Sequence, residues 1–150
     1  MAGKTDKVAC PCGKGVYGAC CGRFISGEAV PATAEQLMRS RYTAFALREE
    51  AYLRATWHPD TLPEEPLTAE DDVKWIGLDV IRHKHVKGAD EGADKGADKG
   101  ADEATVEFVA RFKVGGRGHR LHEVSSFVRQ PDAAGVARWY YVDGAFPDDE

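Results

Sequence analysis

The chain has 150 residues, of which 43% are hydrophobic and 30% are charged, and this composition is typical of one globular domain with a small appendage. No apolar stretch approaches the ~20 residues of a membrane-spanning helix, so we expect a soluble protein. The net charge of −5 argues against broad binding to a nucleic-acid backbone, although residues 1–27 carry a small basic excess.

All the cysteines of the chain lie within twelve residues near the amino end, at Cys10, Cys12, Cys20 and Cys21. Four thiolates in one short loop are typical of a tetrahedral Zn²⁺ site, in which each sulfur lies about 2.3 Å from the metal. The loop also contains four glycines, which permit the positive φ angles that a backbone folding around one ion requires. Since four thiolates leave no position for a substrate or a water, we expect this zinc to be structural.

Disulfides, an iron–sulfur cluster and free thiols remain alternatives to zinc. Disulfides could form only between the two cysteine pairs, because cysteines that are adjacent or two positions apart are too close for a relaxed bridge. An iron–sulfur cluster takes the same four ligands, although its usual spacings differ. The amino-terminal stretch MAGKTDKVA lacks the apolar run of a secretory signal, so we expect a cytoplasmic protein in a reducing compartment.

Two helices are predicted after the cysteine loop. Thr33 and Gln36 form a capping-box pattern, and the good helix formers that follow predict a helix over residues 34–48. A second short helix is expected over residues 51–57, because it must end before a His-Pro pair. Residues 60–72 contain two prolines and many acidic residues, which indicates a surface loop.

Four β-rich segments follow, at residues 73–86, 104–114, 120–130 and 137–144. The second alternates apolar and polar residues, which predicts one buried face. Glycine-rich or Pro-Asp turns precede the third and fourth segments, so the sheet should be mainly antiparallel. Helices followed by strands indicate an α+β fold.

A tetrapeptide of the form Gly-Ala-Asp-Glu/Lys occurs four times in succession at residues 88–103. A glycine in every unit disfavours a helix, and the repeat offers no apolar face to bury. We interpret it as a flexible insert between the first two strands, without a function of its own. Calcium binding by its aspartates is the alternative, but a calcium loop needs a defined ligand order that is absent here.

Several blocks of the sequence resemble known families. The stretch CPCGKGVYGACCG resembles the SEC-C motif, a small zinc-binding element that is also found at the carboxyl end of the SecA translocation motor. The rest is similar to the uncharacterised bacterial YchJ family in the blocks LMRSRYTAF, TWHP, WIGL, VEFVARF, HEVSSF and WYYVDG. The resemblance implies a zinc knuckle at residues 8–27. It also implies a nuclear-transport-factor-2-like cone at residues 28–146, in which helices pack on a curved, mainly antiparallel sheet.

The sequence departs from these patterns in two ways. Seven residues separate Cys12 from Cys20, where SEC-C motifs usually have eight. Some relatives carry a second cysteine motif near the carboxyl end, which this sequence lacks, so a role that needs two knuckles is in doubt. The family resemblance implies a fold and a metal, and it implies no agreed activity.

Cone folds of this kind often hold a pocket, so we looked for polar residues that could converge in one. The candidates are Arg39, Arg41, His58, Glu123 and Ser125. Glu123 and Ser125 share strand parity with apolar neighbours, which predicts that they face the concave side. Each also has a structural interpretation: a buried Arg–Glu pair would link helix to sheet, and His58 would hold a turn.

The other aromatic and imidazole side chains are expected to be structural. The Trp and Tyr residues should fill the core, and His83 and His85 should lie at an exposed strand end. His119 and His122 lack the spacing of a second metal site. The sequence contains no phosphate loop, dinucleotide fingerprint or catalytic-serine motif.

Two functions follow from these observations. The favoured one is a zinc-containing adaptor whose knuckle docks onto a protein or ribonucleoprotein, as the motif does in SecA by analogy. The alternative is a small-molecule-binding protein or enzyme that uses a pocket in the cone. We expect a monomer or a weak dimer. Removal of the metal should disorder residues 8–23 while the α+β body stays folded.

Overall fold

The computed structural model describes residues 8–68, 73–86 and 102–147. The amino-terminal segment contains a short 3₁₀ turn, η2 (Tyr17–Ala19), and the helix α1 (Cys21–Ile25). Two further helices follow, α2 (Ala34–Leu47) and α3 (Glu50–Ala55). The strands are β1 (Val73–Val86), β2 (Asp102–Val114), β3 (Arg117–Pro131) and β4 (Ala137–Ala145). They form one antiparallel sheet in chain order, so the expected α+β fold is confirmed.

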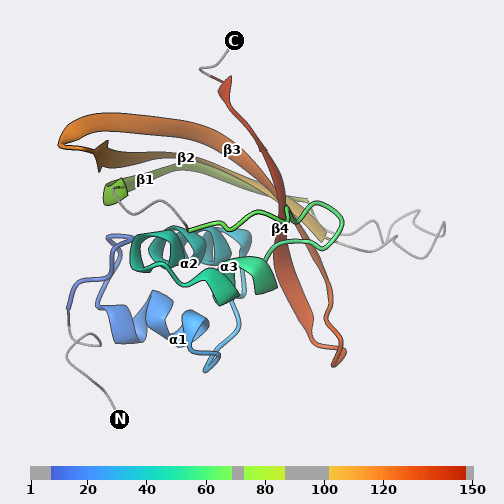
Figure 1. Cartoon of the computed structure of the whole chain (residues 1–150). Coiled ribbons are helices and arrows are strands. Elements are labelled where there is room, and N and C mark those ends of the chain that lie inside the picture. The colour runs from blue at the N-terminus through green and yellow to red at the C-terminus, as the bar shows by residue number, and fades with distance from the viewer. Residues whose placement is uncertain (1–7, 69–72, 87–101, 148–150) are drawn as a thin grey trace.

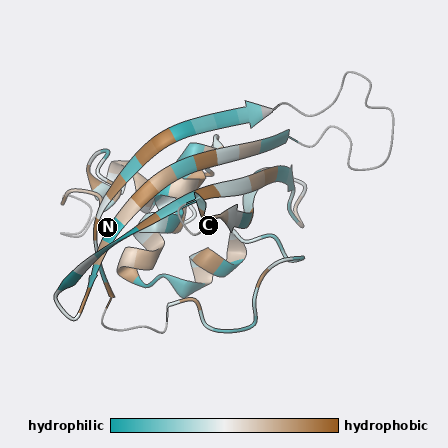
Figure 2. Ribbon diagram, turned by 90° about the horizontal axis from the view of Figure 1, so that it is seen from above, coloured by the Kyte–Doolittle hydropathy of each residue, from teal (hydrophilic) through white to brown (hydrophobic). Residues whose placement is uncertain are grey.

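The molecule has three layers, in which α2 lies between the curved sheet and the amino-terminal segment (Figure 1). Hydrophobic and hydrophilic residues alternate along the strands, which gives the sheet one face suited to packing on helices (Figure 2). Irregularities in the strand register interrupt β1 twice and the β3–β4 pair once. Such bulges bend a strand and increase its twist, and they therefore favour the curvature that wraps the sheet over α2.

The helix α2 forms where the sequence predicts it. The Thr33 side chain accepts a hydrogen bond from the Gln36 N–H at 3.1 Å, and the Gln36 side chain accepts one from the Ala32 N–H at 2.7 Å. This reciprocal cap satisfies two amide donors that the helix itself leaves unpaired. Leu37 and Met38 of α2 are buried, in a cluster shared with Val106 of β2.

The second helix is shorter than the sequence predicts. We expected it to reach residue 57, but α3 ends at Ala55, and the next residues pair with β4 instead. The Tyr141 N–H donates to the Thr56 carbonyl at 2.8 Å, and the His58 N–H donates to the Tyr141 carbonyl at 2.7 Å. A short parallel bridge therefore joins segments more than 80 residues apart and fixes Trp57 against the sheet.

The Gly-Ala-Asp repeat at residues 88–103 lies outside the described residues, apart from Asp102 and Glu103, which belong to β2. The hairpin between β2 and β3 is confirmed: Val114 pairs with Arg117, and the turn residues Gly115 and Gly116 have φ angles of 58° and 82°. Positive φ at both positions is typical of a two-residue hairpin turn. In the described parts of the chain, no helix is long and apolar enough to cross a membrane.

Candidate functional site

The four cysteines converge as the sequence predicts. Their sulfur atoms all lie within 4.8 Å of one another, and the Sγ atoms of Cys12 and Cys20 are 3.5 Å apart. All four are free cysteines. In a tetrahedral site with bonds of about 2.3 Å, the sulfurs would lie about 3.8 Å apart, so small adjustments suffice for coordination. The cluster can therefore hold a metal ion.

Backbone hydrogen bonds shape this loop around the sulfurs. The Cys10 N–H donates to the Gly15 carbonyl at 2.7 Å, and the turn between them contains Gly13 with φ 86°. Of the glycines that we expected to adopt positive φ in this loop, Gly13 does so. Gly22 has a different role, because a Cβ atom there would lie 2.7 Å from both the ring and the carbonyl oxygen of Tyr17.

The cysteine cluster packs directly on α2. Cys10, Cys12 and Cys21 are at most 3% exposed, and they share a hydrophobic cluster with Leu37 of α2. The Sγ of Cys10 lies 3.6 Å from the Thr43 hydroxyl, which can donate a hydrogen bond to a metal-bound thiolate. The sulfurs are thus shielded from solvent by the same helix that faces the sheet.

The protonation of the thiols indicates what a cation would contribute. Hydrogen bonds from Cys12 and Cys21 lower the pKa of Cys10. Burial raises the pKa of Cys20 to about 11, and hydrogen bonds with Cys10 and Cys12 raise the pKa of Cys21. The buried site therefore favours a thiolate at Cys10 and protonated thiols at Cys20 and Cys21, and metal binding to all four sulfurs would release protons.

Arg39, on α2, contacts the cysteine loop. It does not line a pocket in the cone, where the sequence suggested it as a candidate. Its Nε donates to the Glu35 carboxylate at 2.9 Å, and its Nη1 donates to the Cys12 carbonyl at 3.2 Å. Residue 39 follows the cavity-lining Met38 by one position and precedes the cavity-lining Arg41 by two, so its side chain leaves α2 on a different side. It therefore links α2 to the cysteine loop.

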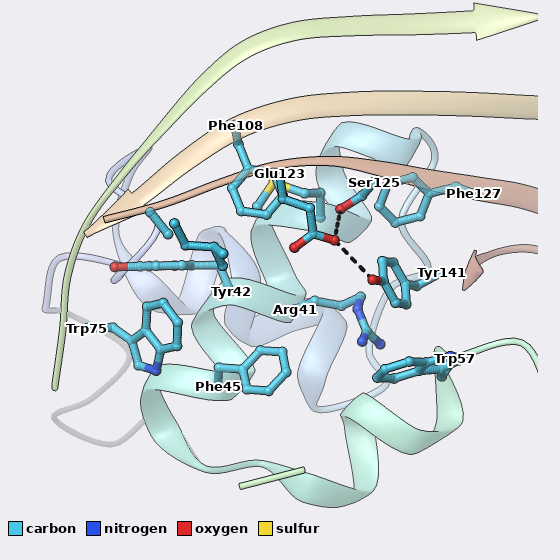
Figure 3. A pocket seen from close by; sticks show the side chains of 13 residues that line it. Arg41, Tyr42, Phe45, Trp57, Trp75, Phe108, Glu123, Ser125, Phe127 and Tyr141 are labelled. Carbon is cyan, nitrogen blue, oxygen red and sulfur yellow. Dashed lines mark hydrogen bonds between the residues drawn. The ribbon is translucent and has the colours of Figure 1, made fainter. Parts of the chain in front are cut away.

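A cavity of about 180 Å³ lies between α2 and the concave face of the sheet. Its walls are mainly aromatic and aliphatic, with three polar residues among them (Figure 3). It is lined by Met38, Arg41, Tyr42, Phe45, Trp57, Trp75, Phe108, Ala110, Leu121, Glu123, Ser125, Phe127 and Tyr141. The aromatic side chains therefore leave part of the cone open, which the sequence had not decided.

Glu123 supplies the acidic group of this cavity and faces the concave side, as its strand parity predicts. It is 8% exposed. The Ser125 hydroxyl donates to its Oε2 at 2.9 Å, and the Tyr141 hydroxyl donates to the same atom at 3.0 Å (Figure 3). Burial raises the pKa of Tyr141, so this phenol stays protonated and keeps donating. A Cβ at Gly144 would lie 2.0 Å from Oε2, so only glycine leaves room for the carboxylate in this position.

Arg41 lies at the side of the cavity, where it is held by α3 and by two aromatic rings. Its Nη1 donates to the Leu53 carbonyl at 2.9 Å and to the Thr56 hydroxyl at 2.7 Å. Its guanidinium carbon lies 5.2 Å from the ring centre of Trp57 and 4.7 Å from that of Tyr141. Burial lowers the pKa of Arg41 to about 10, which leaves it charged at neutral pH.

The direct Arg–Glu pair that we considered from the sequence is replaced by an indirect link. Tyr141 stands between the two side chains, because its ring stacks on Arg41 while its hydroxyl binds Glu123. The sequence offered no signal for this link, since it depends on the bridge between β4 and the segment after α3. Tyr141 and Trp75, which we assigned to the core, are half-buried wall residues of the cavity.

The histidines lie elsewhere. His58 is not among the described residues that line the cavity, and its Nδ1 accepts the Asp60 N–H at 3.1 Å, which is the turn-holding role. His83 is half-buried 3.9 Å from Glu35, which corrects the expectation of an exposed position, whereas His85 is exposed. His122 contacts the Glu107 carboxylate at 2.7 Å on the other face of the sheet from Glu123.

Comparisons with known proteins agree with the geometry. The sequence model described as "YchJ, middle NTF2-like domain" matches residues 33–144. A UPF0225 protein of Ralstonia nicotianae is 55% identical over 143 residues, which cover 91% of this chain and 90% of the relative. A UPF0225 protein of Chromobacterium violaceum is 50% identical over 144 residues, which cover 94% and 95% of the two chains.

Two solved structures are similar to the whole fold. The crystal structure of a SEC-C motif containing protein from Psychrobacter arcticus superposes with a TM-score of 0.68 and 27% identity, over 93% of this chain and 82% of that one. The solution structure of a SEC-C motif containing protein from Rhodopseudomonas palustris gives a TM-score of 0.65 and 31% identity, over 91% and 97%. The similarity therefore extends over the cysteine loop and the sheet together.

Proposed function

The chain belongs to the YchJ family, also described as UPF0225, and from that premise we propose that it is a cytoplasmic, zinc-containing protein that binds a small molecule inside its cone. Zinc is the metal that best suits four thiolates without another ligand type. Free, uncrosslinked cysteines suit a reducing compartment. Two relatives of similar fold are named for the SEC-C motif, which supports the same ligand set.

The zinc is proposed to be structural. Cys10, Cys12, Cys20 and Cys21 would fill its four positions, so none is left for a substrate. When bound, the zinc ion would neutralise the thiolates and hold the loop closed on α2. Thr43 and Arg39 would support it from the helix, the first at the Cys10 sulfur and the second at the Cys12 carbonyl.

The small-molecule function is supported above all by the open, aromatic cavity with a buried carboxylate in its wall. Ligand sites are typically concave, mainly apolar, and equipped with a few oriented polar groups. Glu123 is oriented by Ser125 and Tyr141, so its position is already fixed before a ligand arrives. This fixed arrangement suits a binding site.

Filling the cavity is expected to abolish ligand binding. Ala110 is buried in the cavity wall, so Ala110→Phe should occupy the space, and Leu121→Phe should narrow it from the half-buried edge. Wild-type protein titrated with a set of one- and two-ring aromatic fragments should show NMR shift changes at Tyr42 and Trp75. Binding that persists at the same residues in both folded variants would contradict the proposal, as would the lack of any binder at millimolar concentration.

A second candidate function is an adaptor that docks through the cysteine loop. Val8 and Val16 are 50% and 48% exposed. Lys14 lies between them in the sequence, and its side chain is 61% exposed. Two apolar side chains next to a cation could contact an acidic protein or a ribonucleoprotein surface.

The adaptor proposal predicts that partners are lost with the metal site. The double variant Cys20→Ser and Cys21→Ser should lose the proteins or ribonucleoproteins that copurify with the wild type. Lys14→Glu, which keeps all four thiols, should lose the same partners if the exposed surface makes the contact. An unchanged set of partners in both variants would remove the adaptor function.

A further inference from the structure

The carboxylate of Glu123 presents one oxygen to the cavity. Both the Ser125 and Tyr141 hydroxyls donate to Oε2, and within the described part of the chain no hydrogen bond is formed to Oε1. Figure 3 shows the second oxygen pointing away from these two donors, toward the side where Tyr42 and Trp75 lie. A carboxylate oxygen that faces a mainly apolar cavity without a protein donor is available to a donor brought by a ligand.

The walls define the shape of that ligand. Tyr42, Trp75 and Phe45 form an aromatic wall in which the Tyr42 and Trp75 rings meet edge to face at 5.7 Å. The cavity volume of about 180 Å³ slightly exceeds the roughly 150 Å³ of an apolar cavity that holds benzene. A flat molecule of one ring, or of two small fused rings, therefore fits between α2 and the sheet.

The charges define its polarity. Glu123 is negative and Arg41 is positive, and both lie in the wall of the same small cavity. A cationic ligand would add a second buried positive charge beside Arg41, and an anionic one would oppose Glu123. Either would leave one buried charge in excess and would cost desolvation energy, whereas a neutral donor leaves one positive and one negative charge in the cavity wall.

We infer that the cavity takes a neutral aromatic or heteroaromatic molecule of one or two rings, which donates one N–H or O–H to Oε1 of Glu123. The inference rests on the proposed small-molecule function and specifies its ligand class. Arg41 is held at the side of the cavity, where its Nη1 donates to the Leu53 carbonyl and the Thr56 hydroxyl. Glu123 is thus the residue that selects the ligand by its donor.

Indole and benzofuran test this directly, since they have the same shape and differ by an N–H in place of a ring oxygen. Calorimetric titration of the full-length protein should give a dissociation constant for indole that is roughly 10- to 100-fold lower than for benzofuran, as expected for a hydrogen bond to a charged acceptor. If neither probe binds, the small-molecule function itself fails. If both bind equally, the cavity stands and the donor selection by Glu123 is overturned.

Two variants test whether Glu123 is the acceptor. In Glu123→Gln, an amide oxygen that keeps both bonds from Ser125 and Tyr141 leaves the NH₂ group facing the cavity, and the negative charge is lost in either orientation. The preference for indole should therefore weaken, disappear or reverse. In Gly144→Ala, the new methyl group displaces the carboxylate, and the preference should also be lost although the charge is unchanged. Ser126→Ala, on the opposite face of β3, should keep it. A preference that persists in both Glu123→Gln and Gly144→Ala would overturn the inference.

Discussion

Removal of the metal with a chelator is expected to lower the melting temperature of the whole domain by on the order of 10 °C. Cys10, Cys12 and Cys21 belong to the same buried cluster as Leu37 and Met38 of α2. When the loop opens, the outer side of α2 loses its packing, at a cost comparable to a core truncation of about 2–5 kcal/mol. In a domain of this size, each kcal/mol corresponds to roughly 2–4 °C.

The measurement combines metal analysis with thermal unfolding. Purified protein should contain about one zinc ion per chain, and both chelator treatment and Cys12→Ser should remove it and lower the transition by a similar amount. Ser26→Ala, at an exposed position just after α1, serves as the matched control and should retain the metal and its melting temperature. An unchanged transition without the metal would show that the loop contributes nothing to the body.

This expectation refines what the sequence alone suggested about metal removal. The glycine-rich loop indicated a separate appendage that could disorder by itself while the body stayed folded. The structure adds the contacts of Arg39 with the Cys12 carbonyl and of Thr43 with the Cys10 sulfur. These contacts join residues about 30 positions apart, and no local pattern encodes them. We still expect the sheet and α2 to fold without metal, at the lower temperature given above.

The sequence predicted those features that depend on neighbouring residues. The cap at Thr33, the glycine turn before β3 and the inward side of Glu123 follow from local rules of helix capping, turn geometry and strand alternation. The open cavity could not be predicted in this way. It depends on how far the sheet curves away from α2, and that curvature depends on register shifts between strands that local periodicity does not reveal.

The sequence indicated a buried arginine on α2 without identifying it, and it could not predict the partners of Arg41. They come from α3 and from the Trp57 segment, which reaches the cavity only because it pairs with β4. A sequence places two basic residues on one helix and gives no sign of which one enters the core. Helical spacing shows which arginine is buried only once the packing on both sides of α2 is known. Arg39 then contacts the cysteine loop, and Arg41 lines the cavity.

Arg41→Ala is expected to reduce the free energy of unfolding by about 3–5 kcal/mol. The change removes the hydrogen bonds to the Leu53 carbonyl and the Thr56 hydroxyl and the stacking on Trp57 and Tyr141. It also creates a void where a side chain only 6% exposed had been. Arg111→Ala is the matched control, because Arg111 is half-exposed and pairs with Asp79 on the surface. Such surface pairs contribute about 0–1 kcal/mol.

A second substitution separates what the packing of Arg41 contributes to the free energy of unfolding from what its hydrogen bonds contribute. Arg41→Met keeps much of the volume and removes all donors, so we expect a loss between those of Arg41→Ala and the wild type in urea unfolding. A buried cation carries its own desolvation cost, and a methionine free of that cost could offset the lost hydrogen bonds. If Arg41→Met were as stable as the wild type, the bonds to Leu53 and Thr56 would contribute no net stability. The guanidinium would then serve to balance the charge of Glu123 in the cavity and not to hold the helices together.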